Sequence, residues 1–137
     1  MRVRCVSNVG ADLPADYLSD RYQVSRESHF HVTPGMEYEV YGIVSFVGGF
    51  WYYLADDSFS YYPVWNPAPL FEIIDGSIPK DWRVGTQGTP PVDMVITYPE
   101  WAGDPTYYER LIDREPDAVA AFERRRSRDQ RRDSNRP

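Results

Sequence analysis

The feature that most constrains the fold of this chain is an aromatic block at residues 36–65, which reads MEYEVYGIVSFVGGFWYYLADDSFSYYPVW. Residues 38–47 alternate between two faces with the period of a β-strand. Gly48 and Gly49 can supply the positive φ angles that both central positions of a type I′ turn require, so residues 50–55 are predicted to return antiparallel. This hairpin is expected to form the centre of a sheet.

Short segments of strand-like pattern, separated by tight turns, lie on both sides of the block. Further strands are predicted at residues 2–6, 59–64, 70–74, 78–84 and 92–98. Asp104 suits an N-cap and Pro105 suits a first helical turn, so a helical segment is predicted from about residue 104. The expected fold is mainly β within the α+β class: an SH3-like small antiparallel barrel or curled sheet of six to seven strands, with one or two C-terminal helices, as a single domain at residues 1–122.

Charge is divided unevenly along the chain, whose net charge is −6. Residues 123–137 contain seven Arg and three acidic residues and have almost nothing apolar to bury, so an Arg-rich disordered tail is predicted there. Two alternatives are that this tail folds back on the acidic body or that it contacts RNA or another anionic surface.

The body of the chain, residues 1–122, contains 18 acidic and eight basic residues, a balance of −10. Such a surface repels phosphate backbones, so nucleic acid is not expected as a ligand of the body, and it attracts basic proteins from a distance. The alternative is that the acidic surface only keeps the protein soluble.

No pattern in the sequence indicates a catalytic, metal or cofactor site. His29 and His31 have the His-x-His spacing of a metal-ligand pair, but a structural zinc site needs four ligands and Cys5 is the only cysteine. A lone cysteine also excludes an intramolecular disulfide, and no run of about 18 apolar residues is present. A soluble, cytoplasmic protein without a membrane partner is therefore expected.

The aromatic block holds more rings than one face of a sheet can bury, because neighbouring residues of a strand point to opposite sides. One interpretation is that the C-terminal helices cover the second face. The other is that exposed rings lie beside carboxylates and form a partner-binding surface, since such surfaces suit Arg-rich partners. The predicted partner-binding residues are Glu37, Glu39, Trp51, Tyr53, Asp56, Asp57, Tyr62, Trp65 and Trp82.

Several short motifs resemble those of small bacterial immunity proteins, which accompany polymorphic or contact-dependent toxins. They are YPVWNPAPLF at residues 62–71, Trp82, YPEW at 98–101 and DPTYYE at 104–109, and the likeness extends over about residues 3–122. The resemblance implies a non-enzymatic protein that binds a cognate toxin, often a basic nuclease, and blocks its active site. It carries over no catalytic residue.

The leading hypothesis is therefore a non-enzymatic acidic binding protein that neutralises a cognate bacterial toxin by occluding it, with a basic toxin domain as its protein partner and no cofactor. The alternative is a small β-barrel module that binds a peptide or a cationic ligand through exposed aromatic residues around Trp51, Tyr53 and Trp65. An enzyme of unrecognised type is the third hypothesis.

Overall fold

The computed structural model describes residues 1–86 and 94–134, with side chains described through Arg128. The strands are β1 Arg2–Cys5, β2 Glu37–Phe46, β3 Gly49–Leu54, β4 Val64–Pro67, β5 Phe71–Asp75, β6 Arg83–Gly85 and β7 Val95–Thr97. The helices are α1 Pro99–Ala102, α2 Tyr107–Ile112 and α3 Pro116–Ser134, and short 3-10 helices lie at Gly10–Asp12, Ala15–Tyr17 and Ala68–Leu70. The mainly β prediction is confirmed, and the helical part begins at Pro99, ahead of the predicted start. The first residues of the strand predicted at 92–98 lie outside the described residues.

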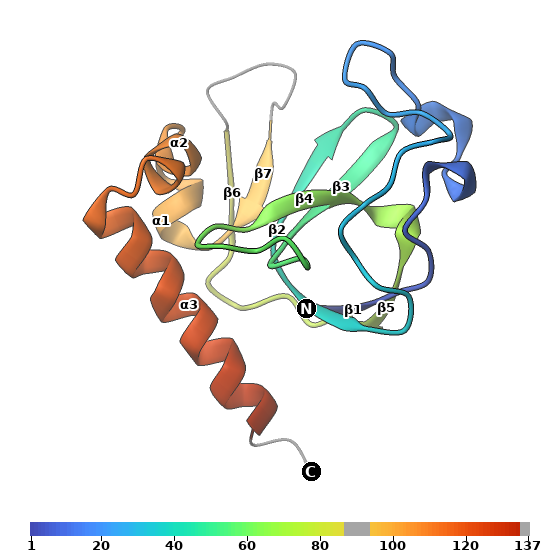
Figure 1. Cartoon of the computed structure of the whole chain (residues 1–137). Helices are drawn as coiled ribbons and strands as arrows, with labels where there is room; N and C mark the ends of the chain where they lie inside the picture. Colours follow the sequence, from blue (N-terminus) through green and yellow to red (C-terminus); the bar gives the residue numbers. More distant parts are fainter. Residues whose placement is uncertain (87–93, 135–137) are drawn as a thin grey trace.

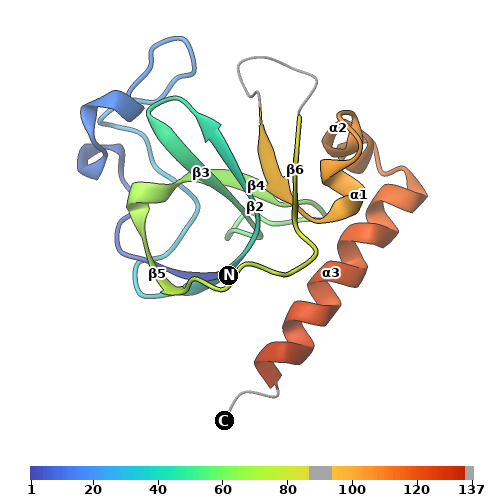
Figure 2. The same ribbon diagram turned by 180° about the vertical axis from the view of Figure 1, so that it is seen from behind.

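One antiparallel sheet contains all seven strands and is organised around β2 (Figures 1 and 2). Its main order is β4-β3-β2-β1-β5. The first part of β2 pairs with β1, while its second part pairs with β3 on one edge and with β7 on the other, and β7 in turn pairs with β6. The sheet is curled and not closed, which confirms the curled-sheet form of the prediction over the barrel.

The predicted central hairpin is present, but its turn differs from the prediction. Phe46 pairs with Gly49, so the two turn residues are Val47 and Gly48. Gly48 has a φ of +87°, whereas Val47 is not among the residues with positive φ. This is the pattern of a type II turn, which needs positive φ only at its second central position, and the predicted type I′ turn at Gly48 and Gly49 is wrong.

A register shift in β2 between Val40 and Gly42 decides which side chains share a face. Val40 is opposite Leu54, whereas Val44 is opposite Trp51. Because directly opposite residues of an antiparallel pair lie on the same face, the two halves of β2 contribute apolar side chains to different faces of the sheet. The uniform alternation expected along residues 38–47 is therefore interrupted, and both faces become buried.

The C-terminal helices cover the face on which Tyr53 lies. The Tyr53 ring packs 4.7 Å from Trp101 of α1 and 5.0 Å from Tyr108 of α2, measured between ring centroids. The hydroxyls of Tyr98 and Tyr107 lie 2.8 Å apart, and Tyr107 donates to the Ala118 carbonyl of α3. Burial raises the pKa of Tyr98 well above its ordinary value and that of Tyr107 to about 12, so both rings stay neutral hydrogen-bonding groups.

Helix α3 differs from the disordered tail predicted for residues 123–137, because it continues to Ser134. Phe122 is fully buried and packs against Tyr41 at a centroid distance of 5.2 Å. One turn later the buried Arg125 donates two hydrogen bonds to the carboxylate of Asp81, one of them at 2.9 Å. This bidentate pair anchors a helix segment that has little apolar surface to bury. Among the side chains of this segment that the structure describes, Arg125 and Arg128 contact Asp81 of the body, as the fold-back alternative expects, and residues 135–137 lie outside the described residues.

Replacing Asp81 by Asn tests this anchor. Hydrogen bonds from Arg125 hold the pKa of Asp81 below its ordinary value. The pair therefore stabilises the fold above the unfolded-state pKa, and this contribution is lost as the pH falls through the lower folded-state pKa, below about pH 4. We expect Asp81→Asn to cost about 1–2 kcal/mol at neutral pH, a figure discounted because the Asp81 side chain is 40% exposed.

Thermal unfolding followed from pH 7 to pH 2.5 measures the effect. The midpoint of Asp81→Asn should lie a few degrees below that of the native protein at neutral pH and converge with it in acid. The matched control is Glu123→Gln, which changes an exposed carboxylate on α3. The difference between its unfolding midpoint and that of the native protein should be the same at every pH. Parallel pH profiles for native protein and Asp81→Asn would contradict the anchor.

Candidate functional site

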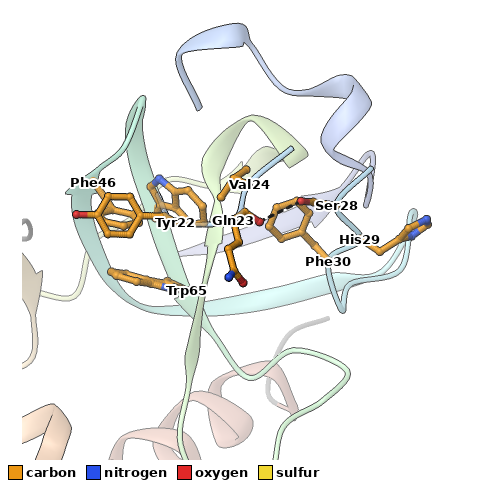
Figure 3. Close-up of a pocket in the computed structure, with 9 residues that line it drawn as sticks. Tyr22, Gln23, Val24, Ser28, His29, Phe30, Phe46 and Trp65 are labelled. Atoms are coloured by element: carbon orange, nitrogen blue, oxygen red, sulfur yellow. Dashed lines mark hydrogen bonds between the residues drawn. The ribbon is translucent and has the colours of Figure 1, made fainter. Parts of the chain in front are cut away.

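An open pocket of about 290 Å³ lies between the N-terminal segment and the ends of β2, β3 and β4 (Figure 3). Its lining consists of Tyr22, Gln23, Val24, Ser28, His29, Phe30, Phe46, Trp51 and Trp65. Phe46 comes from the end of β2, Trp51 from β3 and Trp65 from β4, while the others belong to residues 22–30. Segments far apart in the sequence thus build one aromatic wall, which we call the aromatic pocket.

The rings of the pocket contact one another in a continuous chain. Phe46 and Trp65 are stacked, with centroids 4.4 Å apart and planes inclined by 16°. Tyr22 meets Phe46 edge-on at 4.9 Å, and Trp51 lies 5.4 Å from Phe46. Phe30 approaches Trp51 at 6.5 Å. Figure 3 shows Tyr22, Phe46 and Trp65 gathered together, whereas the imidazole of His29 points away from them. Mutual packing of this kind fixes the ring orientations before any ligand binds.

The polar groups of the pocket are few and uncharged at its aromatic wall. The Nε1–H of Trp51 donates to the Val47 carbonyl at 2.9 Å. Within the part of the chain that the structure describes, the indole N–H of the half-buried Trp65 has no hydrogen-bond partner. Neither a carboxylate nor a basic Lys or Arg side chain is among the nine lining residues described. The wall therefore offers apolar ring faces without a charged side chain among the described lining residues.

The N-terminal side of the pocket is held in place by polar contacts. The guanidinium of Arg26 donates to the carbonyls of Ala11 and Leu13, at 3.0 and 2.6 Å. Ser19 and Val24 exchange two backbone hydrogen bonds of 2.9 Å, which closes the turn that carries Tyr22. These contacts order a segment that has little regular secondary structure, so the pocket is preformed.

The predicted acidic binding residues are not gathered in one surface. Glu37 is exposed, but the side chain of Glu39 is only 10% exposed and binds the terminal ammonium of Met1 at 3.3 Å. Asp56 is buried and accepts hydrogen bonds from its own turn and from β4. Asp57 accepts hydrogen bonds from a threonine and a tyrosine hydroxyl. The carboxylate of Asp56 thus closes a turn in the interior, whereas its prediction as a binding residue assumed an exposed side chain.

The predicted aromatic binding residues fall into two groups. Trp51 and Trp65 line the aromatic pocket, although Trp51 is itself 3% exposed and presents only part of its ring. Tyr53 is buried beneath the C-terminal helices, so its prediction as a surface residue is wrong. Tyr62 and Trp82 are half-buried against the core and lie outside the pocket lining.

Three rings of the pocket, those of Tyr22, Phe30 and Phe46, are not among the binding residues predicted from the sequence. Tyr22 and Phe30 lie in a segment without a periodic pattern, which gave no indication of which way their rings point. The uniform alternation predicted along residues 38–47 puts Phe46 on the same face as Val40, and the register shift moves it to the other face. The one sequence feature that indicates a pocket residue is the position of Phe46 next to the hairpin turn, because such residues lie at the end of a sheet.

The remaining candidate residues have structural surroundings. His29 and His31 are exposed, and among the described residues no group of three or more His, Cys, Asp or Glu side chains could hold a metal ion. Cys5 is buried, its thiol donates to the Ser7 carbonyl, and burial raises the pKa of the thiol. Across residues 1–86 and 94–134, no helix combines the length and the apolar character needed to cross a membrane.

Comparisons with protein-family models, with curated proteins and with solved structures found no match to this chain. Function is therefore inferred from the geometry of the aromatic pocket and from the distribution of charge.

Gly48 tests how the hairpin positions the pocket. A Cβ at this residue would lie 2.6 Å from the ring of Tyr17, whose hydroxyl donates to the Phe50 carbonyl, and the φ of +87° is unfavourable for any L residue. We expect Gly48→Ala to destabilise the fold by about 2–3 kcal/mol and to alter the near-ultraviolet circular dichroism of the neighbouring rings.

Gly35→Ala is the matched control, because Gly35 has a φ of +90° with nothing within 4 Å of the added Cβ. Gly35→Ala should lower the free energy of unfolding by about 1 kcal/mol, through backbone strain alone, and should leave the near-ultraviolet circular dichroism unchanged. Equal losses of stability in chemical denaturation of the two variants would show that the contact with Tyr17 does not position the hairpin.

Proposed function

We propose that this protein is a non-enzymatic protein-binding module whose aromatic pocket receives an extended, proline-containing segment of a partner. The observation that carries the proposal is the stacked pair of Phe46 and Trp65 in the pocket lining, where the indole N–H of Trp65 has no hydrogen-bond partner among the described residues. Pro-rich segments in the polyproline II conformation dock on aromatic-lined grooves, where rings pack against prolines and a donor binds a peptide carbonyl.

The composition of the lining favours a proline-containing peptide over a cationic side chain. A cation can be attracted by ring faces alone, but its desolvation is offset best where a carboxylate also lies in the site. The nine described lining residues include no carboxylate. A proline ring is apolar and fixed in φ, so it can lie on an aromatic wall with little loss of conformational entropy.

Preorganisation supports the same proposal. The rings of the pocket already pack against one another, and hydrogen bonds from Arg26 hold the facing segment. A ligand would therefore not have to order these side chains, a cost of about 0.5–1.5 kcal/mol for each immobilised side chain. More of the free energy gained by burying the aromatic surface is then available for binding, because less is lost to ordering the side chains.

Titration with a blocked polyproline peptide tests this function. Binding should quench or shift the tryptophan fluorescence, and Trp65→Ala should weaken it by about thirtyfold, which corresponds to the loss of about 2 kcal/mol for an aromatic hot spot. Trp82→Ala is the matched control, because Trp82 is also half-buried but lies outside the pocket. Circular dichroism checks that both variants fold.

A peptide containing trimethyl-lysine is the competing probe. Tighter binding of that peptide than of polyproline would favour the cationic-ligand form of the module. If neither peptide binds, or if Trp82→Ala weakens binding as much as Trp65→Ala, the aromatic pocket is not the binding site.

A second candidate function is the neutralisation of a basic toxin in the cytoplasm, and the charge beside the pocket favours it. Residues 12–27 contain four carboxylates, on Asp12, Asp16, Asp20 and Glu27, all of them exposed. The same segment contains two arginines, and the guanidinium of Arg26 is bound to backbone carbonyls. An acidic segment of this kind, next in sequence to the lining residues, would accelerate association with a basic toxin domain, and the bound protein would block the toxin's active site by occupying it.

The toxin hypothesis predicts an association rate that falls steeply with ionic strength, because screening removes long-range attraction. Co-expression of this protein should restore the growth of cells that make the product of a neighbouring toxin-like gene. The double variant Asp16→Asn, Asp20→Asn should slow association with the toxin while leaving the dissociation rate nearly unchanged. The double variant Glu100→Gln, Glu109→Gln, which removes two exposed carboxylates on α1 and α2, is the control for net charge. Failure of rescue together with a salt-independent rate would exclude the toxin as the partner.

A further inference from the structure

Gln23, on the N-terminal side of the aromatic pocket, has an unusual backbone conformation. Its φ angle is +58°, and among the described residues other than glycine only Arg114 also has a positive φ. Glycine and asparagine adopt this left-handed conformation most readily, whereas a longer side chain is strained in it. The turn imposes the conformation, because the Gln23 N–H donates to the Asp20 carbonyl at 3.2 Å. Backbone hydrogen bonds between Ser19 and Val24 close the same turn.

The turn does not require a glutamine side chain at this residue. Among the described residues the Gln23 carboxamide has no hydrogen-bond partner, and the side chain is exposed. Glycine would supply the same backbone conformation without the strain. Strained residues of this kind are found preferentially at ligand-binding sites, where the side chain is needed for contact with the ligand. The strain at Gln23 therefore directs attention to its carboxamide.

The side chain of Gln23 belongs to the lining of the aromatic pocket. Figure 3 shows it extending from its turn toward Trp65, with the amide at its end. Of the nine described lining residues, Gln23 is the one with a carboxamide. A carboxamide accepts and donates hydrogen bonds, so it can bind a backbone N–H and a backbone carbonyl of a peptide at the same time. Proline has no N–H, so a continuous run of prolines matches only the donor side of this group.

We propose that Gln23 selects a partner segment in which a residue with a backbone N–H lies next to the proline that packs on Phe46 and Trp65. The Oε1 atom of Gln23 accepts a hydrogen bond from that N–H, and its Nε2 atom donates to a backbone carbonyl of the same segment. This inference rests on the proposed function, because it adds a requirement to the proline-containing ligand of the pocket. The rings bind the proline, and Gln23 distinguishes a mixed segment from polyproline.

The size of the preference follows from the environment of the bound segment. A peptide that lies on an aromatic wall is partly removed from water, so a backbone N–H without an acceptor there is unfavourable. With polyproline bound, the Oε1 atom of Gln23 would in turn have no donor from the ligand. One neutral hydrogen bond of this kind changes the dissociation constant about fivefold.

Titration with two blocked peptides tests the preference. In the first peptide prolines alternate with alanine, and in the second each alanine is replaced by N-methylalanine, which removes the N–H and keeps the carbonyl. The native protein should bind the first peptide about fivefold more tightly, whereas Gln23→Gly should bind both with equal affinity. The thermal unfolding midpoint of Gln23→Gly should rise by about 2 °C, because glycine relieves the strained φ. A side chain with only a structural role in the turn would lower the midpoint when it is removed.

The matched control is Arg114→Gly, which makes the same kind of backbone change at a residue outside the lining of the aromatic pocket. This variant should keep the fivefold preference. Equal binding of the two peptides to the native protein, or a preference that persists in Gln23→Gly, would overturn the role of Gln23. In either case, weaker binding of polyproline to Trp65→Ala would still support the proposed function. A native protein that binds none of the three peptides would overturn both.

Discussion

The structure depends on the register shift in β2 between Val40 and Gly42. Before the shift β2 contributes Val40, opposite Leu54, to one face of the sheet, and after it Val44 lies opposite Trp51 on the other. A bulge of this kind also increases strand twist, which helps the sheet curl. One strand of ten residues therefore serves two apolar layers, and the aromatic face exists because of this change.

The C-terminal helices pack on one end of the aromatic face and the N-terminal segment packs on the other. The pocket lies between these two regions. Trp101 and Tyr108 from the helices lie over Tyr53. At the other end Tyr17, from the N-terminal segment, lies 6.1 Å from Trp51. Trp65 bridges the two regions, since its ring is 5.9 Å from each of the rings of Tyr53 and Trp51. The exposed part of Trp65 is thus fixed by packing on both sides, as a binding surface requires.

The sequence predicted what depends on local periodicity and missed what depends on distant partners. The central hairpin and the excess of rings over one face follow from alternation, and both are present. Tyr22 could not be assigned to the pocket, because its segment has no period and is held by polar contacts. Burial of Arg125 depends on Asp81, 44 residues away, which no local pattern reveals. The same holds for the burial of Asp56, because its hydrogen-bond donor Asn66 lies on β4.

The packing of α3 gives the molecule a charge polarity that bears on how a partner approaches. Figures 1 and 2 show α3 and the N-terminal segment on opposite sides of the sheet. The sequence of α3 contains six arginines and four acidic residues, and Arg125 is neutralised by Asp81, while residues 12–27 contain four exposed carboxylates and two arginines. The basic partner proposed above would therefore be repelled from the α3 side and drawn toward the segment that carries Tyr22. The fold that anchors α3 would thus also orient the proposed encounter toward the aromatic pocket.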